Sequence, residues 1–414
     1  MKKITNILGF IMLLSLPVQA QTLEDYFIQA AENNPGLQAK YKAFEASLEK
    51  IPQANALPDP TLSFGYFISP VETRVGPQRA RFSLNQMFPW FGTLKASGNV
   101  AALNADAQYQ VFLDERNKLY YQVSAAYYPL YELNKWLELE RENAEILESY
   151  KTIATTKFEN AEGTLVDALR VDLMLKDAQT NIEILEEKKQ PLLSLFNQLL
   201  NRDEFEPVNT PDSLVISSDF EVYPKDSLYH ENPVLQELDY KIKASQVQET
   251  LAEKQGLPKL GVGLDYVIVG TRDDLAPGTS ISDDGQDALM PMVSLSIPLY
   301  RGKYRAAKKE AQLNQQSYTL QKENAINTLT SGYEMGVFDL SQQSQLVTLY
   351  HEQIAQTKQV LNLLLTAYGN SGKEFEEVLR VQQQLLKYQK MKATALMKYH
   401  IALAKLDYLT AKKF

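Results

Sequence analysis

The side chains that most often carry chemistry are sparse and scattered in this 414-residue chain. Its three histidines, His230, His351 and His400, are far apart in the sequence, and cysteine is absent. Paired carboxylates, a nucleophile elbow and a glycine-rich phosphate loop are also missing from the sequence. We therefore expect a protein that is not an enzyme and that holds no cofactor and no metal site.

The charged residues that do stand out occur in a repeated pattern. Leu169-Arg170-Val171 returns 210 residues later as Leu379-Arg380-Val381, and a carboxylate, Asp167 or Glu377, precedes each leucine by two residues. Asn34-Pro35 likewise returns as Asn232-Pro233 after 198 residues. Repeats this far apart predict two copies of one large supersecondary unit.

The first twenty residues have the features of a cleaved secretory signal. Lys2 and Lys3 precede an apolar run from Ile7 to Leu16, and Val18 and Ala20 place small residues before Gln21. The alternative is an N-terminal core helix, but the basic start and short apolar run favour a signal peptide. A mature chain that begins at Gln21 and lacks cysteine would carry no lipid anchor.

The overall charge and hydropathy limit the possible partners. The formal net charge of the whole chain is −9, which argues against a nucleic-acid partner. No segment after the leader offers the run of about 18 apolar residues that a transmembrane helix requires.

The second copy is the clearer one. No proline follows Pro298, and a heptad seam predicts a long coiled-coil helix that begins at about residue 303. We expect this helix to end at Gly369 to Gly372 and a return helix to bury one face. The seam consists of Leu340, Val347, Ile354, Leu361 and Tyr368, and the inward face of the return helix of Val378, Val381, Leu385, Tyr388, Ala395, Tyr399, Leu403 and Leu406.

The first copy repeats this helical hairpin. A helix is expected from Gly92 to about Ala161, then a turn at residues 162–164 and a return helix with Val171 and Leu175 inward. Pro129 lies inside the outgoing helix, where it should cause a bend. Gly332 and Gly336 lie near the equivalent place in the second copy, so we expect a shared bend there.

Two segments with a period of two precede each hairpin. Leu62, Phe64, Tyr66 and Ile68 alternate with smaller residues, and Leu260 to Ile268 repeats the pattern. We expect strands at about 60–69 and 79–89 in the first copy, joined by a turn from Ser69 to Pro77. The second copy should have strands at about 259–269 and 289–299.

Alternating strands of about ten residues in an exported chain are typical of outer-membrane barrels. Four strands are too few to close a barrel, and open edges are not tolerated in lipid. Three chains would supply twelve strands. The alternative is a soluble periplasmic protein whose β-hairpins pack on its own helices.

The order helix, two strands, long helix, glycine turn and return helix, present twice, resembles the TolC-like outer-membrane efflux family. The resemblance covers essentially the whole mature chain. It rests on both Asn-Pro pairs, on residues 83–92 (SLNQMFPWFG) and 294–302 (SLSIPLYRG) where strand becomes helix, and on residues 163–169 and 372–379 at the hairpin tips. No single motif is specific, but their repeated order is.

The resemblance implies a mainly α fold with a small β part and a homotrimer. A twelve-stranded barrel in the outer membrane would continue into a helical barrel in the periplasm. The first repeat would span residues 21–200 with its hairpin at about 93–200. The second would span 230–414 with its hairpin at about 303–414. Residues 201–229 would connect them near the middle of the helical barrel.

The resemblance also implies roles for particular residues. Asp167, Glu377, Arg170 and Arg380 would lie at or near a periplasmic gate, where an acidic ring selects cations and an arginine pairs with one of the carboxylates. The tips Gly163, Leu169, Gly372 and Leu379 would meet a periplasmic adaptor protein. Trp90, Phe91 and Tyr300 would lie at the membrane interface, although ordinary core packing is an alternative for these aromatics.

The function implied is a passive exit duct of a tripartite efflux or secretion system. Its partners would be two further copies of the chain, an adaptor, an inner-membrane pump and outer-membrane lipid. The competing interpretation is a non-porous coiled-coil protein with a structural or adhesive role.

Overall fold

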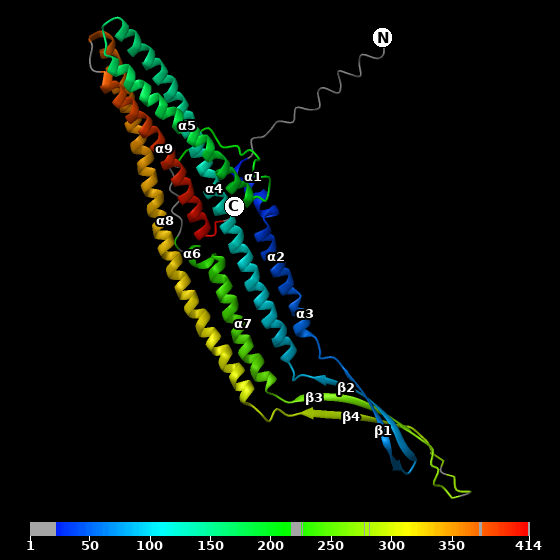
Figure 1. Cartoon of the computed structure of the whole chain (residues 1–414). Coiled ribbons are helices and arrows are strands. Elements are labelled where there is room, and N and C mark those ends of the chain that lie inside the picture. Colours follow the sequence, from blue (N-terminus) through cyan, green and yellow to red (C-terminus); the bar gives the residue numbers. More distant parts are fainter. Residues whose placement is uncertain are drawn as a thin grey trace, which may run out of the picture. The chain divides into compact units, whose positions relative to one another are not determined.

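The structure is a computed structural model that describes residues 22–216, 225, 227–276, 278–280, 282–371 and 375–412 (Figure 1). The expected signal peptide and Gly372 lie outside the described residues. The fold is mainly α-helical with one small sheet, as the sequence indicates. The helices are α1 (Leu23–Asn33), α2 (Pro35–Leu48), α3 (Lys50–Asn55), α4 (Thr93–Glu159), α5 (Leu165–Leu199), α6 (Ser227–His230), α7 (Pro233–Gln255), α8 (Gly302–Ser371) and α9 (Phe375–Leu409).

The chain forms two compact units, and each draws on both expected repeats. The hairpin unit comprises Met1–Ala39, Leu113–Asn232 and Asn327–Phe414, and the sheet unit comprises Lys40–Phe112 and Pro233–Ile326. Within the described residues, no helix combines the length and the apolarity needed to cross a membrane.

Four helical segments share one core in the hairpin unit, where α4 lies beside α5 and α8 beside α9 (Figure 1). Leu147 and Val171 are fully buried in this core, and Val378 and Leu361 are 1% and 7% exposed. The seam residues Leu340, Val347, Leu361 and Tyr368 are all less than 9% exposed. The heptad pattern therefore identified the buried face of α8, because burying that face is what stabilises so long a helix.

The repeated Asn-Pro pairs join helix ends in the hairpin unit. Asn34 Nδ2 donates to the carbonyl oxygen of Leu199, the last residue of α5, at 2.8 Å. Asn232 Nδ2 donates in the same way to the carbonyl of Leu409, the last residue of α9, at 3.0 Å. Helix ends leave carbonyls without partners, so each asparagine satisfies one that would otherwise be orphaned.

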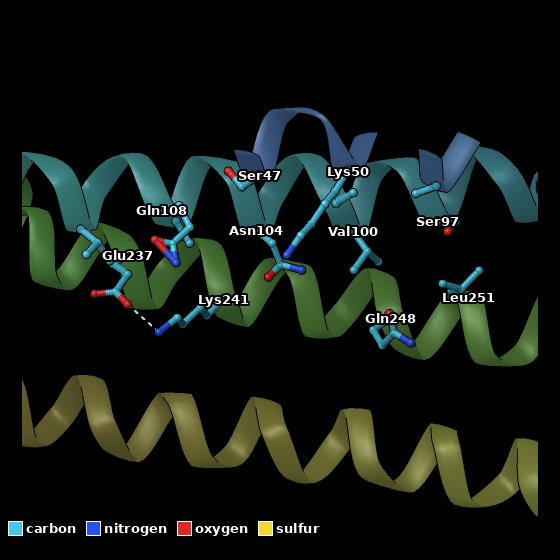
Figure 2. A pocket seen from close by; sticks show the side chains of 14 residues that line it. Ser47, Lys50, Ser97, Val100, Asn104, Gln108, Glu237, Lys241, Gln248 and Leu251 are labelled. Carbon is cyan, nitrogen blue, oxygen red and sulfur yellow. Dashed lines mark ion pairs between the residues drawn. The ribbon is translucent and has the colours of Figure 1, made fainter. Parts of the chain in front are cut away.

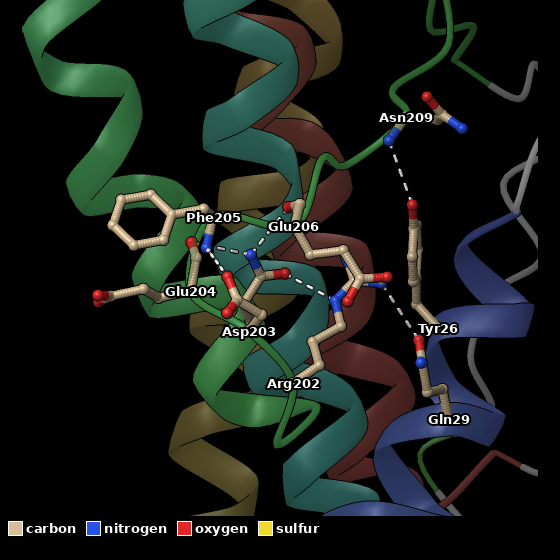
Figure 3. Close-up of polar contacts among 9 residues, drawn as sticks. Tyr26, Gln29, Arg202, Asp203, Glu204, Phe205, Glu206 and Asn209 are labelled. Atoms are coloured by element: carbon tan, nitrogen blue, oxygen red, sulfur yellow. Dashed lines mark hydrogen bonds and ion pairs between the residues drawn. The ribbon is translucent and has the colours of Figure 1, made fainter.

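The segment after α5 is fastened to α1 by a buried arginine (Figure 3). Arg202 Nε donates to Asn197 Oδ1 at 2.7 Å, and its Nη1 lies 3.3 Å from Gln29 Oε1. Further along, the backbone N–H of Asn209 donates to the hydroxyl of Tyr26. The Tyr26 ring packs on the ring of Phe196, with centroids 5.1 Å apart. Residues 202–209 of the expected connecting segment thus pack on α1 and α5, whereas Leu214 and Ile216 pack against Tyr131 of α4 and the core shared with α8 and α9.

The sheet unit holds one antiparallel sheet of order β1-β2-β3-β4. Its strands are β1 (Thr61–Thr73), β2 (Gly76–Phe88), β3 (Lys259–Val269) and β4 (Ala288–Ser296). β1 pairs only with β2 and β4 only with β3, so within the described chain both edges of the sheet are unpaired.

The first β-hairpin differs from expectation. The expected turn from Ser69 to Pro77 is wrong, since β1 continues to Thr73 and only Arg74 and Val75 separate it from β2. The register shifts between Tyr66 and Val71. Such an irregularity interrupts the strict alternation of apolar and small residues. The alternation pattern therefore did not reveal that β1 continues beyond Ser69.

The glycines of the second copy lie at two places on α8. The helix continues through Gly369 and ends at Ser371, within the expected break from Gly369 to Gly372. Gly332 and Gly336 face α9: a Cβ on Gly336 would come within 2.8 Å of Leu406 Cδ2, and one on Gly332 within 3.5 Å of Leu409 Cδ1. Gly332 and Gly336 therefore allow α9 to approach α8 closely. In the first copy, α4 remains helical through Pro129.

Candidate functional site

The two helical-hairpin tips are tied together by side chains from different helices. Arg170 Nη1 on α5 lies 2.6 Å from Glu376 Oε2 on α9. Lys157 Nζ, at the end of α4, lies 3.1 Å from the carbonyl oxygen of Tyr368 on α8 and 4.2 Å from the centroid of its ring. These two ties, which we call the tip links, connect the α4/α5 hairpin to the α8/α9 hairpin.

The other predicted gate residues make local contacts. Asp167 accepts from the Thr164 hydroxyl at 2.8 Å in the first turn of α5, where a carboxylate favours the helix N-terminus. Arg380 pairs with Glu377 one turn away on α9. An arginine therefore does pair with one of the two carboxylates, but Arg170 reaches Glu376 instead of Asp167.

Tyr368 of α8 is close enough to Asp167 of α5 for the two side chains to interact electrostatically. Burial raises the pKa of the Tyr368 hydroxyl above its usual range, and the charge of Asp167 raises it further. The ring stacks on Phe375 with centroids 4.6 Å apart. The sequence placed Tyr368 in the seam but gave no signal for Lys157, because an α4 lysine and an α8 tyrosine meet only in the fold.

The expected adaptor-contact residues differ in accessibility. Leu169 is 55% exposed, whereas Leu379 is 4% exposed and belongs to the hairpin core. A Cβ on Gly163 would lie 3.1 Å from the Lys157 Cβ, so the turn after α4 is tight. The structure thus presents Leu169 at the surface and keeps Leu379 inside, while Gly372 lies outside the described residues.

One face of the sheet is apolar and exposed. Leu62 of β1 pairs across to Leu84 and then to Leu264, and Phe64 aligns in the same way with Phe82 and Tyr266. The apolar residues of β1 that face outward, Leu62, Phe64, Tyr66 and Ile68, are 63–92% exposed. Large exposed apolar patches mark binding surfaces or membrane contact.

The opposite face of the sheet carries mostly polar and small side chains, with methionines and Val267 among them. Ser63 aligns with Ser83 and then with Asp265, which is 2% exposed and lies 3.6 Å from Arg81. A sheet with one apolar and one polar face has the side-chain pattern of a wall between lipid and water.

Aromatic side chains stand exposed where the strands meet the helices. Phe91 and Tyr300 are 78% and 92% exposed, and Trp90 is 36% exposed with its ring edge-on to that of Phe91 at 6.0 Å. Their exposure argues against core packing, which was the alternative for these three residues.

A groove of about 460 Å³ with a mixed polar and apolar lining lies in the sheet unit among α2, α3, α4 and α7. Figure 2 shows Lys50 reaching from α3 toward Asn104 of α4, while Glu237 forms an ion pair with Lys241 on α7. Glu237 is the single acidic residue that lines the groove. Among the described residues, no three histidine, aspartate or glutamate side chains are grouped to hold a metal.

Comparison with known proteins supports the resemblance found in the sequence. The family model for outer membrane efflux proteins matches residues 226–412. The outer membrane efflux protein BepC of Brucella suis biovar 1 (strain 1330) is 23% identical over 300 residues, which cover 68% of this chain. The match spans 61% of BepC, less than two thirds of its length.

The fold matches solved structures over nearly the whole chain. A membrane protein from Pseudomonas aeruginosa matches with a TM-score of 0.76 and 15% identity, covering 94% of this chain and 93% of that one. The outer membrane protein VceC of Vibrio cholerae matches with a TM-score of 0.74 and 14% identity, covering 94% and 95%. Together with the family match, these similarities confirm the resemblance to TolC-like outer-membrane efflux proteins.

Proposed function

We propose that this chain, a TolC-like outer-membrane efflux protein, is the passive exit duct of a tripartite efflux or secretion system. Its sheet would join those of two further copies in a twelve-stranded barrel in the outer membrane, and its helices would form the wall of a periplasmic duct. The observation that carries this proposal is the four-stranded sheet, whose two edges have no partner strand among the described residues and whose apolar face is exposed.

The physical argument concerns the edges. Unpaired N–H and C=O groups on β1 and β4 cannot remain without partners in hydrocarbon, where each costs several kcal/mol. Pairing β1 of one copy with β4 of the next would satisfy both edges and close the ring with no change of fold within a chain. The exposed apolar face would then meet lipid, and Trp90, Phe91 and Tyr300 would reach the headgroup layer.

Disulfide trapping tests this arrangement cleanly because the chain has no cysteine of its own. Leu62→Cys on β1 is combined in turn with Leu289→Cys, Pro291→Cys or Val293→Cys on β4, which sample three registers. We expect one pair to give a covalent trimer after membrane extraction. The matched control, Leu62→Cys with Leu264→Cys, places both cysteines on strands of one chain that are not neighbours. A chain that stays monomeric and dissolves without detergent would contradict the proposal.

We further propose that the hairpin tips are the gate and the docking site for an adaptor. Three copies of Asp167 and Glu377 around one axis would favour cations, and Arg170 and Arg380 would supply countercharge. Gly163 and Leu169, with Gly372 and the buried Leu379 behind them, would form the end that meets an adaptor joined to an inner-membrane pump. Planar-bilayer recordings in which Glu377→Ala left conductance and cation preference unchanged would refute the gate.

A non-porous structural or adhesive protein remains the competing function. The exposed apolar sheet face favours the duct, because a periplasmic coiled-coil protein would cover that face with its own helices. Conductance of the purified trimer separates the two functions directly.

A further inference from the structure

A pocket of about 350 Å³ lies in the sheet unit where β2 ends and α4 begins. Three lysines from separate segments line it: Lys254 at the end of α7, Lys259 at the start of β3 and Lys303 at the start of α8. Trp90 and Tyr304 also line it. We call this site the lysine pocket.

The lysine pocket gathers positive charge from three side chains. None of its lining residues is acidic, and in the described part of the chain none of the three ammonium groups has an ion-pair partner. The pocket also holds the first turn of α4, whose backbone N–H groups carry a partial positive charge.

Lys254 approaches that helix end closely. Its Nζ lies 3.2 Å from the position that a Cβ on Gly92, the residue before α4, would occupy. Gly92 has a φ of +76°, a conformation that favours glycine, so the backbone leaves room for the ammonium. A lysine beside the positive end of a helix is unfavourable unless an anion lies between them.

A buried hydroxyl in the pocket also lacks a partner. Thr93, the first residue of α4, is 7% exposed, and across the described residues its Oγ1 has no hydrogen-bond partner. Leaving a buried hydroxyl unpaired costs about 1–3 kcal/mol in general, and a bound water or ion is one explanation for such a group in a native structure. This hydroxyl can donate to an oxygen held between the lysines.

We propose that the lysine pocket binds a phosphate group, carried by an anionic lipid head group. Ammonium groups, a hydroxyl donor and helix N-terminal amides together match an anion with several acceptor oxygens. The lipid source rests on the proposed function: the pocket lies at the junction of sheet and helices beside Trp90, at the level where the inner headgroup layer would meet the protein. The acyl chains would then lie along the exposed apolar face of the sheet.

Native mass spectrometry of the full-length protein in a non-ionic detergent tests the proposal. The ligands are phosphatidylglycerol, diacylglycerol with the same acyl chains, and inorganic phosphate. We expect phosphatidylglycerol to bind and diacylglycerol not to, and we expect Lys254→Gln and Lys303→Gln each to weaken phosphatidylglycerol binding about tenfold, the usual effect of a charge-assisted hydrogen bond. The matched control is Lys95→Gln, which removes the same charge from an exposed position in the first turn of α4 outside the pocket.

Thr93→Val separates binding from folding. Valine keeps the side-chain shape and removes the unpaired hydroxyl, so the ligand-free protein should be as stable as wild type or more stable, while phosphatidylglycerol binding weakens about threefold or more. Loss of stability without ligand would show instead that the hydroxyl serves the fold, and would contradict the proposal.

The remaining outcomes each decide a point. Binding of inorganic phosphate with the same dependence on Lys254 and Lys303, but no retained lipid, would assign the pocket to free phosphate. Equal binding of phosphatidylglycerol and diacylglycerol, or equal losses in the Lys95 and Lys254 variants, would refute a phosphate site. Inorganic phosphate binding requires no membrane and no open channel. A failed conductance experiment would therefore count against the duct and leave the phosphate-binding test of the lysine pocket valid.

Discussion

Lys157 Nζ lies 3.1 Å from the carbonyl oxygen of Tyr368 and 4.2 Å above the centroid of its ring. One ammonium thereby joins α4 to α8, and Arg170 and Glu376 join α5 to α9 nearby. If the proposed duct opens by separation of the hairpins, these two tip links must break.

Lys157→Met should therefore favour separation of the hairpins. A cation over an aromatic face contributes about 0.5–1 kcal/mol at an exposed site, so the open population should rise by about twofold to fivefold. Single-channel recording measures this rise. Lys151→Met is the matched control, because Lys151 pairs with Asp172 inside one hairpin and its loss should leave the open population unchanged.

Glu376→Gln should act in the same direction and Glu377→Gln should not. Glu376 contacts Arg170 of the other hairpin, while Glu377 contacts Arg380 on its own helix. The Arg170–Glu376 pair is largely exposed, so removing the pair should raise the open population only slightly. The rise should be smaller still in high salt. The open probability of single channels at low and high ionic strength checks the prediction; an equal change of open probability in the two variants would show that cross-hairpin pairing is irrelevant to opening.

The glycines of α8 give a matched pair for stability. Gly336→Ala should destabilise the hairpin unit by about 1–3 kcal/mol, because the new methyl group would meet Leu406 at 2.8 Å. Gly332→Ala has 3.5 Å to its nearest atom and should be neutral or stabilising by up to about 1 kcal/mol. Thermal unfolding in detergent ranks the variants, and equal effects would rule out close packing of α9 as the reason for the glycines.

Asn34 and Asn232 should stabilise the C-terminal ends of α5 and α9, whose last carbonyls accept their hydrogen bonds. Asn232 is 3% exposed, and Asn232→Ala would leave the Leu409 carbonyl without its 3.0 Å donor, at a cost of about 1–3 kcal/mol. Asn232→Asp, which keeps the shape and removes the donor, should cost at least as much. Urea unfolding of the hairpin unit within the intact chain measures both, and a silent aspartate variant would contradict the role.

His400 should make the hairpin unit sensitive to acid. Burial lowers the pKa of His400 to about 4, partly opposed by a hydrogen bond to the Val215 backbone. Because this folded-state pKa lies below the unfolded value of about 6.5, the unfolded chain binds more protons in between, and stability is lost as pH falls from about 6.5 toward 4. The loss should reach about 1–3 kcal/mol.

His400→Phe should abolish that pH dependence, since phenylalanine can keep the stacking on Tyr128, whose ring centroid is 5.0 Å away. His351→Gln changes an exposed histidine and should retain the slope. Urea unfolding at pH 7 and at pH 4.5 compares the three proteins, and an unchanged slope in the phenylalanine variant would assign the acid sensitivity to other groups.

The sequence by itself determined the order of the elements and the buried faces of the helices. Heptads place Leu340 and Val347 on one face of a helix wherever that helix packs, and alternation places Phe64 and Leu62 on one face of a strand. These are local periodicities, which the backbone geometry converts directly into faces. The repeated Asn-Pro pairs also marked helix starts, although the carbonyl that each asparagine caps was not foreseeable.

Only the tertiary structure decided which side chains meet. Arg170 contacts Glu376 instead of Asp167, which lies three residues away. Leu169 and Leu379 occupy equivalent places in the repeat, yet one is exposed and the other buried, because the two hairpins pack differently around a shared core. Lys254, Lys259 and Lys303 come together only where strands and helices from three segments converge. Contacts between residues far apart in the chain depend on packing, which no local period encodes.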